Sequence, residues 1–253
     1  MFYSKNLKKI TSIKHCFFSR KYGFSKGIYK SLNCGRGSGD KRKSINKNLE
    51  FVSKKMGVAN NKLILMHQTH SNKVVEVKES NYKKKIKADA MITKMKNISL
   101  SVVTADCVPI ILYDAKNQII GCIHAGWKGA YLGIIKNTIN KIKKLNSKSL
   151  IYASVGPCIN QKSYEVDLIF FKKFIKKSKK NKKYFIKKNG DKKLFNLRKF
   201  VTDILLKYKI KVDQVDRDTF AEKSNFFSYR RASKLREKDY GRCISSICMP
   251  KLY

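Results

Sequence analysis

The side chains best suited to chemistry are few, because the chain of 253 residues contains only four histidines. Two of them, His70 and His124, and one cysteine, Cys107, each follow a short β-branched segment bounded by polar residues. Such segments predict strands, and side chains at the ends of neighbouring strands can meet in one cleft. The three segments are residues 63–66, 99–103 and 119–123.

Together, His70, Cys107 and His124 offer two imidazoles and one thiolate. Three protein ligands with an open fourth position are typical of catalytic zinc, whereas structural zinc normally has four protein ligands. Zinc makes a bound water acidic enough to attack near neutral pH. The sequence therefore predicts one mononuclear metal site, with zinc as the expected ion and copper as a possible one.

Other interpretations of the same residues remain open. Cys107 can be a nucleophile with His124 or His70 as its base. Alternatively, His67 and His70 are ordinary histidines at a strand edge and Cys107 is a small core residue before Pro109.

A glycine-flanked turn follows His124 and opens a predicted helix. Glycine lets a ligand approach the backbone, and free N–H groups at a helix start attract anions. Lys128 adds a positive charge, and Trp127, the only tryptophan, can stack on a planar ligand or simply pack. We expect an anionic ligand group to bind at this turn.

Strands and helices alternate along the rest of the chain, which predicts an α/β fold with a mixed sheet. No repeat and no Pro/Ser/Gly-rich linker marks a boundary, so residues 1–253 are expected to form a single domain. Residues 22–40, rich in glycine, are expected to be loops. The further predicted strands are 74–77, 110–113, 150–155, 226–229 and 243–249, and the predicted helices are 41–56, 129–145, 166–175 and 196–208.

The formal net charge of +41 is the most unusual property of the composition. Taken alone it favours nucleic acid or an anionic membrane as a partner. Only nine of the 58 basic residues are arginine, however, and lysine is enriched together with isoleucine and asparagine, which indicates a codon-level bias. We therefore expect no specific nucleic acid, and the lysine run at 172–193 is interpreted as a solvated helix and loop.

Hydropathy and cysteine usage define the expected compartment. No run of about 18 uncharged apolar residues is present, so no membrane span is predicted. Seven cysteines form no CxxC pair, and an odd count leaves at least one unpaired. A soluble protein with reduced thiols in the cytoplasm fits best.

Seven co-linear motifs make the sequence similar to the YfiH-like laccase-domain proteins. That family is variously described as multicopper polyphenol oxidases, purine nucleoside phosphorylases and peptidoglycan editing factors. The resemblance covers nearly the whole chain, and departs from the family pattern at Ser71 and at Tyr22-Gly23. The motifs are residues 17–40, 67–77, 88–94, 102–114, 121–129, 155–166 and 218–242.

The resemblance implies a layered α/β/β/α fold with mixed sheets. It also implies that His70, Cys107 and His124 are the metal ligands, and it leaves His67 outside the ligand set. Four further residues match family positions that are expected near the substrate pocket: Arg20, Asn33, Lys128 and Arg230.

The activity implied by the resemblance is phosphorolysis of adenosine, inosine and methylthioadenosine, together with hydrolytic deamination of adenosine. Small purine nucleosides and phosphate are then the partners. Asp106 or His67 is expected to move the proton during deamination. The phosphate dianion needs cations, for which Arg20, Lys128 and Arg230 are the candidates.

Three alternatives stay open at this point. The first is copper-dependent polyphenol oxidation: four histidines are too few for a multicopper centre, but a single site of two histidines and one cysteine can still bind copper or support weak oxidation. Hydrolytic editing of peptidoglycan precursors would use the metal or Cys107 on a muropeptide. A basic nucleic-acid-binding protein with a structural metal is the third alternative.

Overall fold

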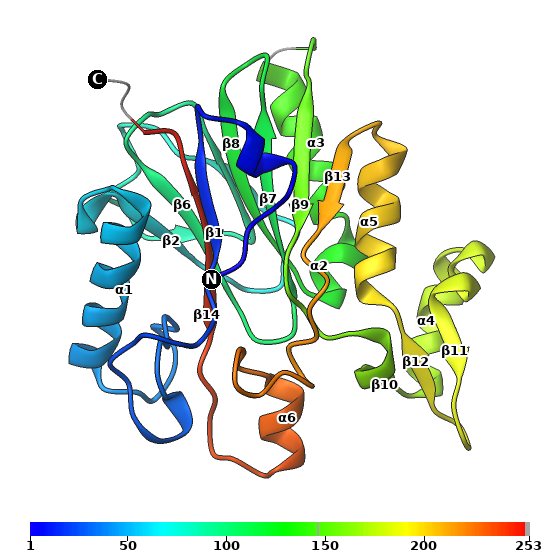
Figure 1. The fold of residues 1–253 in the computed structure, drawn as a ribbon. Coiled ribbons are helices and arrows are strands. Elements are labelled where there is room, and N and C mark those ends of the chain that lie inside the picture. The colour runs from blue at the N-terminus through cyan, green and yellow to red at the C-terminus, as the bar shows by residue number, and fades with distance from the viewer. Residues whose placement is uncertain (146, 251–253) are drawn as a thin grey trace.

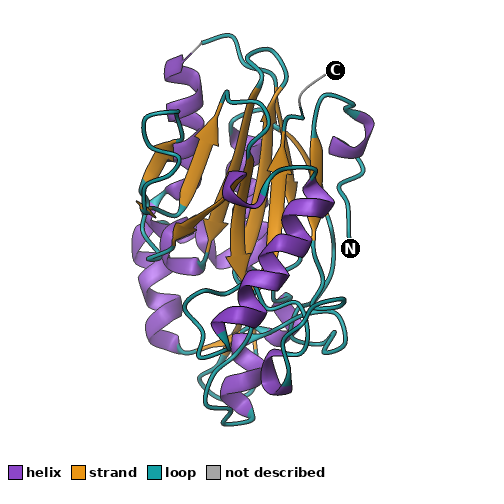
Figure 2. Cartoon of the chain, turned by 90° about the vertical axis from the view of Figure 1, so that its left-hand side faces the viewer, coloured by secondary structure: helices purple, strands orange, loops and turns teal. Residues whose placement is uncertain are grey.

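The structure is a computed structural model that describes residues 1–145 and 147–250. Two β-sheets stack face to face, and helices cover the outer face of each sheet (Figure 1). Figure 2 is turned so that the side of helix α1 (Arg42–Met56) faces the viewer, and it shows this helix lying across the strands. The predicted α/β/β/α layering with mixed sheets is therefore confirmed.

The first sheet has five strands and joins both ends of the chain. Strands β14 (Cys243–Cys248) and β6 (Ser99–Thr104) of this sheet are antiparallel, with Cys243 opposite Thr104. Strand β2 then runs parallel to β6, so their carboxyl ends lie at the same edge of the sheet. The order is β1 (Lys14–Phe17), β14 (Cys243–Cys248), β6 (Ser99–Thr104), β2 (Leu63–His67) and β4 (Ile86–Lys87).

The second sheet has six strands built around the antiparallel hairpin of β7 and β8. Both faces of this hairpin are buried, which explains its almost unbroken apolar sequence. The order is β13 (Lys211–Gln214), β9 (Ile151–Val155), β7 (Val108–Asp114), β8 (Ile119–Ala125), β5 (Ala90–Thr93) and β3 (Val74–Glu76).

Three hydrophobic layers alternate with the sheets and helices. On β7, Ile110 and Leu112 face the helices, whereas Ile111 and Tyr113 face the first sheet. Alternate side chains of a strand point to opposite faces of its sheet, so β7 contributes to two hydrophobic layers. A third layer lies between the first sheet and α1 (Arg42–Met56).

The helix predicted at 129–145 is two helices in the structure. Gly133 has a φ of 93° and ends α2 (Trp127–Leu132), after which α3 (Ile134–Leu145) continues with its isoleucines buried. Only glycine adopts this left-handed conformation without strain, so the single-helix prediction missed a C-cap.

Residues 165–195 form a small unit at one edge of the molecule (Figure 1). Its aromatic interior includes the stacked rings of Phe185 and Phe195, 4.8 Å apart. The lysine run at 172–193 lies mostly at the surface, as expected, but includes strand as well as helix and loop. The elements are β10 (Glu165–Val166), α4 (Leu168–Lys177), the 3₁₀ helix η5 (Lys179–Tyr184), β11 (Phe185–Lys187) and β12 (Lys193–Phe195).

The predicted strand at 226–229 is wrong. Phe226 and Phe227 are buried with Cys243 in a small cluster, so their hydrophobicity reflects a packed loop. Ser228 accepts a hydrogen bond from the N–H of Arg231 and begins α6 (Tyr229–Lys234). The sequence analysis also missed seven strands, which are β1, β4, β5, β10, β11, β12 and β13.

The remaining elements are α5 and several single turns. Asn196 caps α5 (Leu197–Lys207) by accepting from the N–H of Lys199, close to the predicted start of this helix. None of the helices in the described part of the chain is long and apolar enough to cross a bilayer. The other 3₁₀ turns are η1 (Leu7–Lys9), η2 (Gly27–Tyr29), η3 (Asn60–Lys62) and η4 (Gln161–Ser163).

Candidate metal centre

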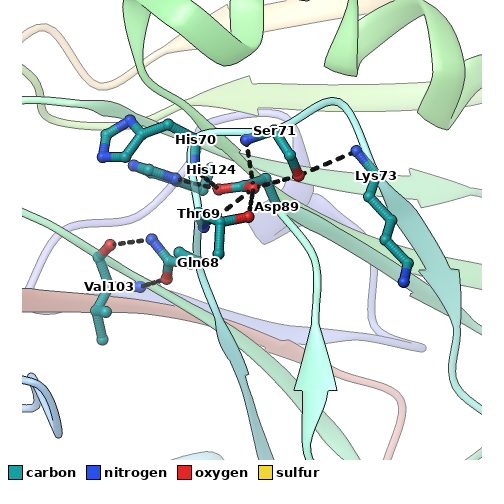
Figure 3. Close-up of polar contacts among 8 residues, drawn as sticks. All are labelled: Gln68, Thr69, His70, Ser71, Lys73, Asp89, Val103 and His124. Atoms are coloured by element: carbon teal, nitrogen blue, oxygen red, sulfur yellow. Dashed lines mark hydrogen bonds and ion pairs between the residues drawn. The ribbon is translucent and has the colours of Figure 1, made fainter.

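His70 lies in the loop that leaves β2, and its backbone is left-handed, with a φ of 56°. A non-glycine residue keeps this conformation only where its surroundings hold it. Here the buried carboxylate of Asp89 does so, because it accepts from the N–H of His70 at 3.0 Å and from that of Ser71 at 2.6 Å. Strand β5, which Asp89 precedes, thereby sets the position of this loop (Figure 3).

Gln68 ties the same loop to the first sheet. Its side-chain amide donates to the carbonyl of Val103 and accepts from the N–H of the same residue, at 2.8 and 2.9 Å. These are the two backbone bonds that a neighbouring strand would otherwise make with Val103, near the end of β6 (Figure 3). The loop that carries His70 is therefore attached to both sheets.

Cys107 and His124 are brought together by the β7–β8 hairpin. Cys107 is in the sharp turn between β6 and β7, where Asp106 has a φ of 85°. His124 is opposite Pro109 in the register of the hairpin, two residues beyond Cys107. The pairing of β7 with β8 therefore sets the imidazole beside the thiol.

The ligand atoms of His70, Cys107 and His124 lie within 4.8 Å of one another. The two imidazole rings meet edge to face, with centroids 4.7 Å apart and planes at 70°. A Cβ atom at Gly126 would come within 2.8 Å of Nδ1 of His70 and 2.9 Å of Sγ of Cys107. Glycine at this position keeps open the space between the ligands, and this group of three can hold a metal ion.

The second nitrogen of His124 is bonded to protein. Its Nδ1 lies 2.8 Å from Oδ1 of Asp89 (Figure 3). Burial by itself raises the pKa of Asp89, but hydrogen bonds from His124 and Ser71 outweigh it and hold this pKa well below its usual range. The ionised carboxylate accepts, so His124 donates through Nδ1 and its Nε2 is free to bind a metal.

The charge environment of the centre favours a cation. Burial lowers the pKa of His124, but the adjacent sulfur of Cys107 and the bond to Asp89 raise it to about 9. By contrast, burial and the neighbouring His124 lower the pKa of His70. The buried carboxylate of Asp89 and the half-buried sulfur of Cys107 therefore attract positive charge, which a proton or a metal ion can supply.

The three ligands open into a cavity of about 1300 Å³. Trp127 and Tyr164 line it beside the ligands, and Arg230 is packed against Tyr164 with its guanidinium 5.3 Å from the ring centroid. His67 lines the same cavity from the end of β2. The arrangement can bind a flat ring and an anion next to a metal ion.

Of the four residues expected near the pocket, Arg230 lines the cavity and Arg20, Asn33 and Lys128 do not. The guanidinium of Arg20 stacks on Phe227 and donates to backbone carbonyls, including that of Lys30 at 2.6 Å. Asn33 is fully buried and bonds to neighbouring loops. Lys128 is exposed on α2.

Asp106 lines the cavity beside Cys107, but its carboxylate is occupied. It accepts from the hydroxyls of Thr219 and Ser228, at 2.7 and 2.8 Å, and from the N–H of Arg230 at 2.7 Å. These contacts tie the turn of Cys107 to the start of α6. Burial is the largest influence on Asp106 and raises the pKa of its carboxyl.

Sequence reasoning did not single out Asp89, Gln68 or Tyr164. Among these, Asp89 left a usable signal, since an aspartate between two alanines at 88–90 is flanked by apolar residues and is expected to be buried with partners. The turn that contains Gly126 was expected to let a ligand approach the backbone, but the contact of Gly126 with both His70 and Cys107 joins residues far apart in sequence, which no local pattern shows.

Fold and site define a layered α/β/β/α protein with a His–Cys–His group at the carboxyl ends of its strands. A family model for the multi-copper polyphenol oxidoreductase laccases matches residues 14–250, and the chain belongs to this family. A protein of Rickettsia conorii named purine nucleoside phosphorylase is 36% identical over 217 residues, covering 83% of this chain and 88% of its own length.

Solved structures confirm the resemblance to YfiH-like proteins. A Neisseria meningitidis protein superimposes with a TM-score of 0.85 at 28% identity and covers 95% of this chain and 96% of its own. Bacillus licheniformis YfiH, described as a hypothetical protein, gives a TM-score of 0.87 at 25% identity and covers 94% of this chain and 92% of its own.

Proposed function

We propose that this chain is a zinc-dependent purine nucleoside phosphorylase that acts on adenosine, inosine and methylthioadenosine, with deamination of adenosine as a second reaction. One observation carries the proposal. The metal-ligand group opens into the same cavity as an arginine and two aromatic rings, Arg230, Tyr164 and Trp127. The name of the Rickettsia conorii relative supports the same reaction class.

Zinc fits the donor set better than copper clusters do. Two imidazoles and a thiolate suit one tetrahedral ion with an open position, and Gly126 leaves that space free of a side chain. A multicopper centre needs more histidines, and of the other two His15 is bonded to the N–H of Ser4. A bound zinc supplies Lewis acidity and an acidic water at the open position.

The chain's own residues bind and orient the substrates in this proposal. Arg230 lines the cavity and has one guanidinium nitrogen bonded to the carbonyl of Glu165, at 2.7 Å, so its remaining donors are available to phosphate. Tyr164 makes no hydrogen bond through its hydroxyl within the described residues, so this hydroxyl is free to bind the ligand. Trp127 offers a face for the purine ring.

Proton transfer during deamination is assigned to His67. It is exposed at the end of β2 and lines the cavity, whereas the oxygens of Asp106 are already bonded by three donors. Asp106 is then a positioning residue that holds the turn of Cys107 against α6.

The test follows adenosine with inorganic phosphate, measuring adenine, ribose 1-phosphate and inosine while metal content is determined on protein purified without added metal. We expect one zinc per chain and release of adenine that depends on phosphate. Cys107→Ser removes the thiolate and should abolish both, whereas Cys122→Ser, in the core between the sheets, leaves the ligands intact.

Other outcomes identify the alternatives. Turnover of a muropeptide precursor in place of nucleosides would establish hydrolytic editing of peptidoglycan precursors, and oxygen consumption with a phenol in copper-loaded protein would establish polyphenol oxidation. Tight, salt-sensitive RNA binding by a metal-free variant would point to a nucleic-acid-binding protein. A metal-free protein that fully retains nucleoside turnover would contradict the zinc assignment.

A further inference from the structure

Arginine is concentrated at the cavity of the metal centre. Only nine of the 58 basic residues are arginine, yet four of these nine line this one cavity. Three lysines, Lys83, Lys84 and Lys85, also line the cavity, but a codon-level bias toward lysine does not explain why arginines outnumber them there when lysine is far more abundant in the chain. The planar, forked donors of arginine suit phosphate and carboxylate groups. The four are Arg36, Arg42, Arg230 and Arg242.

Arg242 is built into the wall of the cavity. Its aliphatic stem fills the place of a Cβ at Gly35, which would lie 2.8 Å from its Cδ. Its guanidinium lies 4.4 Å from the ring centroid of Tyr240. Oδ1 of the buried Asn33 accepts from the N–H of Gly35 at 3.0 Å and from that of Arg242 at 2.9 Å. Asn33 thus clamps together the segments that carry Arg36 and Arg242.

The sheet register connects this wall to the metal centre. Cys243 is opposite Thr104, so Arg242, one residue earlier, lies beside the start of the turn that carries Cys107. Both Thr104 and Ala105 line the cavity between them. The arginines of this wall therefore extend the same cavity away from the ligands.

Positive charge in this part of the cavity is not neutralised by the chain. The guanidinium groups of Arg36 and Arg42 make no hydrogen bond or ion pair with any described residue. Among the described residues that line the cavity, Asp106 is the one carboxylate, and three donors already occupy it. Asp239, which Arg242 influences, lies outside the lining and is bonded by neighbouring loops. Arg36 and Arg42 are exposed, so their guanidinium groups are available to an anion that enters the cavity.

We infer that Arg36, Arg42 and Arg242 form an arm of the cavity that binds the phosphate of a purine nucleoside 5′-phosphate. The inference rests on the proposed function and names the substrate class of the same site. The cavity, at about 1300 Å³, exceeds the roughly 300–1,000 Å³ of ordinary small-molecule pockets. With the purine and C1′ beside the metal centre, C5′ is the ribose substituent that points away from it.

The reaction on such a substrate is balanced without further reactants. An oxygen of inorganic phosphate bonds to C1′ while the bond from C1′ to N9 breaks. The electron pair of that bond leaves with the base, which takes up the proton that inorganic phosphate, reacting as its monohydrogen dianion, gives up. Adenosine 5′-monophosphate would yield adenine and ribose 1,5-bisphosphate, with no change of oxidation state.

The experiment compares adenosine and adenosine 5′-monophosphate by calorimetry and by adenine release in the presence of inorganic phosphate. The variant is Arg36→Gln/Arg42→Gln, since neither side chain is packed into the wall. Lys43→Gln/Arg236→Gln is the matched control, because it removes two charges at exposed positions outside the lining. Circular dichroism confirms that both variants are folded.

Wild type should bind the monophosphate at least about tenfold more tightly than adenosine. The arm variant, Arg36→Gln/Arg42→Gln, should bind the monophosphate about tenfold or more weakly than wild type. Its affinity for adenosine should change by less than about twofold. The control should match wild type. Equal affinities for the two ligands in wild type would overturn the inference. So would an arm variant in which only the KM for inorganic phosphate rises, because the arm then serves the co-substrate.

Failure of the two proposals can be told apart. If the monophosphate binds through the arm but neither ligand is cleaved, the proposed phosphorolysis fails and the arm stands. If adenosine is cleaved and the monophosphate is neither bound nor cleaved, the arm fails and the proposed function stands.

Discussion

The carboxylate of Asp89 lies 2.8 Å from Nδ1 of His124, and both side chains are buried. The same carboxylate accepts from the backbone N–H groups of residues 69–71, which include that of His70. One residue outside the ligand set thus orients one ligand ring and holds the loop of another. Partners of this kind fix the tautomer of a ligating histidine and raise its basicity.

Asp89→Asn should therefore weaken metal binding by about 10–100-fold, the usual cost of removing such a partner. A carboxamide does not supply the negative charge, and its nitrogen would face N–H donors of the loop. Competition with a chelator of known affinity measures the effect. Asp114→Asn is the matched control, because Asp114 is also buried and bonded but lies at the far end of β7. Equal metal affinity in wild type and Asp89→Asn would contradict this role.

Gly126→Ala should remove the metal and leave the fold intact. The added Cβ would stand 2.8 Å from Nδ1 of His70 and 2.9 Å from Sγ of Cys107, inside the space that an ion needs. Elemental analysis and thermal unfolding of the apoprotein measure the two effects separately. Gly37→Ala is the control, since nothing lies within 4 Å of its added Cβ. An alanine variant that still holds one ion per chain would show that the ion sits elsewhere.

The grouping of His70, Cys107 and His124 was predictable because their chemistry is rare in this chain. Four histidines and short β-branched segments made the three residues candidates, and the family resemblance selected them as the expected ligand set. Asp89 was not predictable as the partner of His124, because three of its donors are backbone N–H groups that carry no residue-type signal and the side-chain donors lie 18 or more residues away in the sequence. For Arg20 the family motif pointed to a place near the substrate pocket. In the structure its guanidinium instead donates to backbone carbonyls of a loop, including that of Lys30.

The alternation of strands and helices was predicted from the hydrophobic pattern, and the α/β/β/α layering was implied by the family resemblance. The interruptions of the pattern were not predicted. Hydrophobic spacing continues from α2 into α3, so the break at Gly133 depends on one backbone angle that the spacing does not reveal. The apolar pair Phe226 and Phe227 has the composition of a strand, but tertiary packing against Cys243 places it in a loop.

Acid stability should depend on His15. Its Nε2 accepts from the N–H of Ser4 at 2.9 Å, which requires the neutral ring, and burial, only partly offset by Asp213, lowers its pKa to about 4. The unfolded chain binds this proton near pH 6.5, so the stability present above that pH is lost as the pH falls toward 4. The loss amounts to about 3 kcal/mol over this range.

Urea unfolding at pH 7 and at pH 5 tests the effect of His15 by comparing wild type with His15→Gln. Glutamine can accept from Ser4 but does not titrate, so the variant should lose less stability between the two pH values. An unchanged pH dependence would mean that His15 is protonated in the folded state as well.

Asp106→Asn distinguishes a positioning residue from a proton carrier. The carboxylate accepts from two hydroxyls and from the N–H of Arg230, and an amide nitrogen in its place would face a donor. We expect a loss of about 1–3 kcal/mol in the free energy of unfolding, the usual cost of an unsatisfied buried polar group. Metal content and the shape of the pH–rate profile should be retained, because the group only holds the turn of Cys107. Thr219→Val, which removes a single donor, should lower the free energy of unfolding by less.

If Asp106 instead carried the proton, Asp106→Asn would abolish one limb of the pH–rate profile of deamination at unchanged stability. His67 would then lose the role proposed for it.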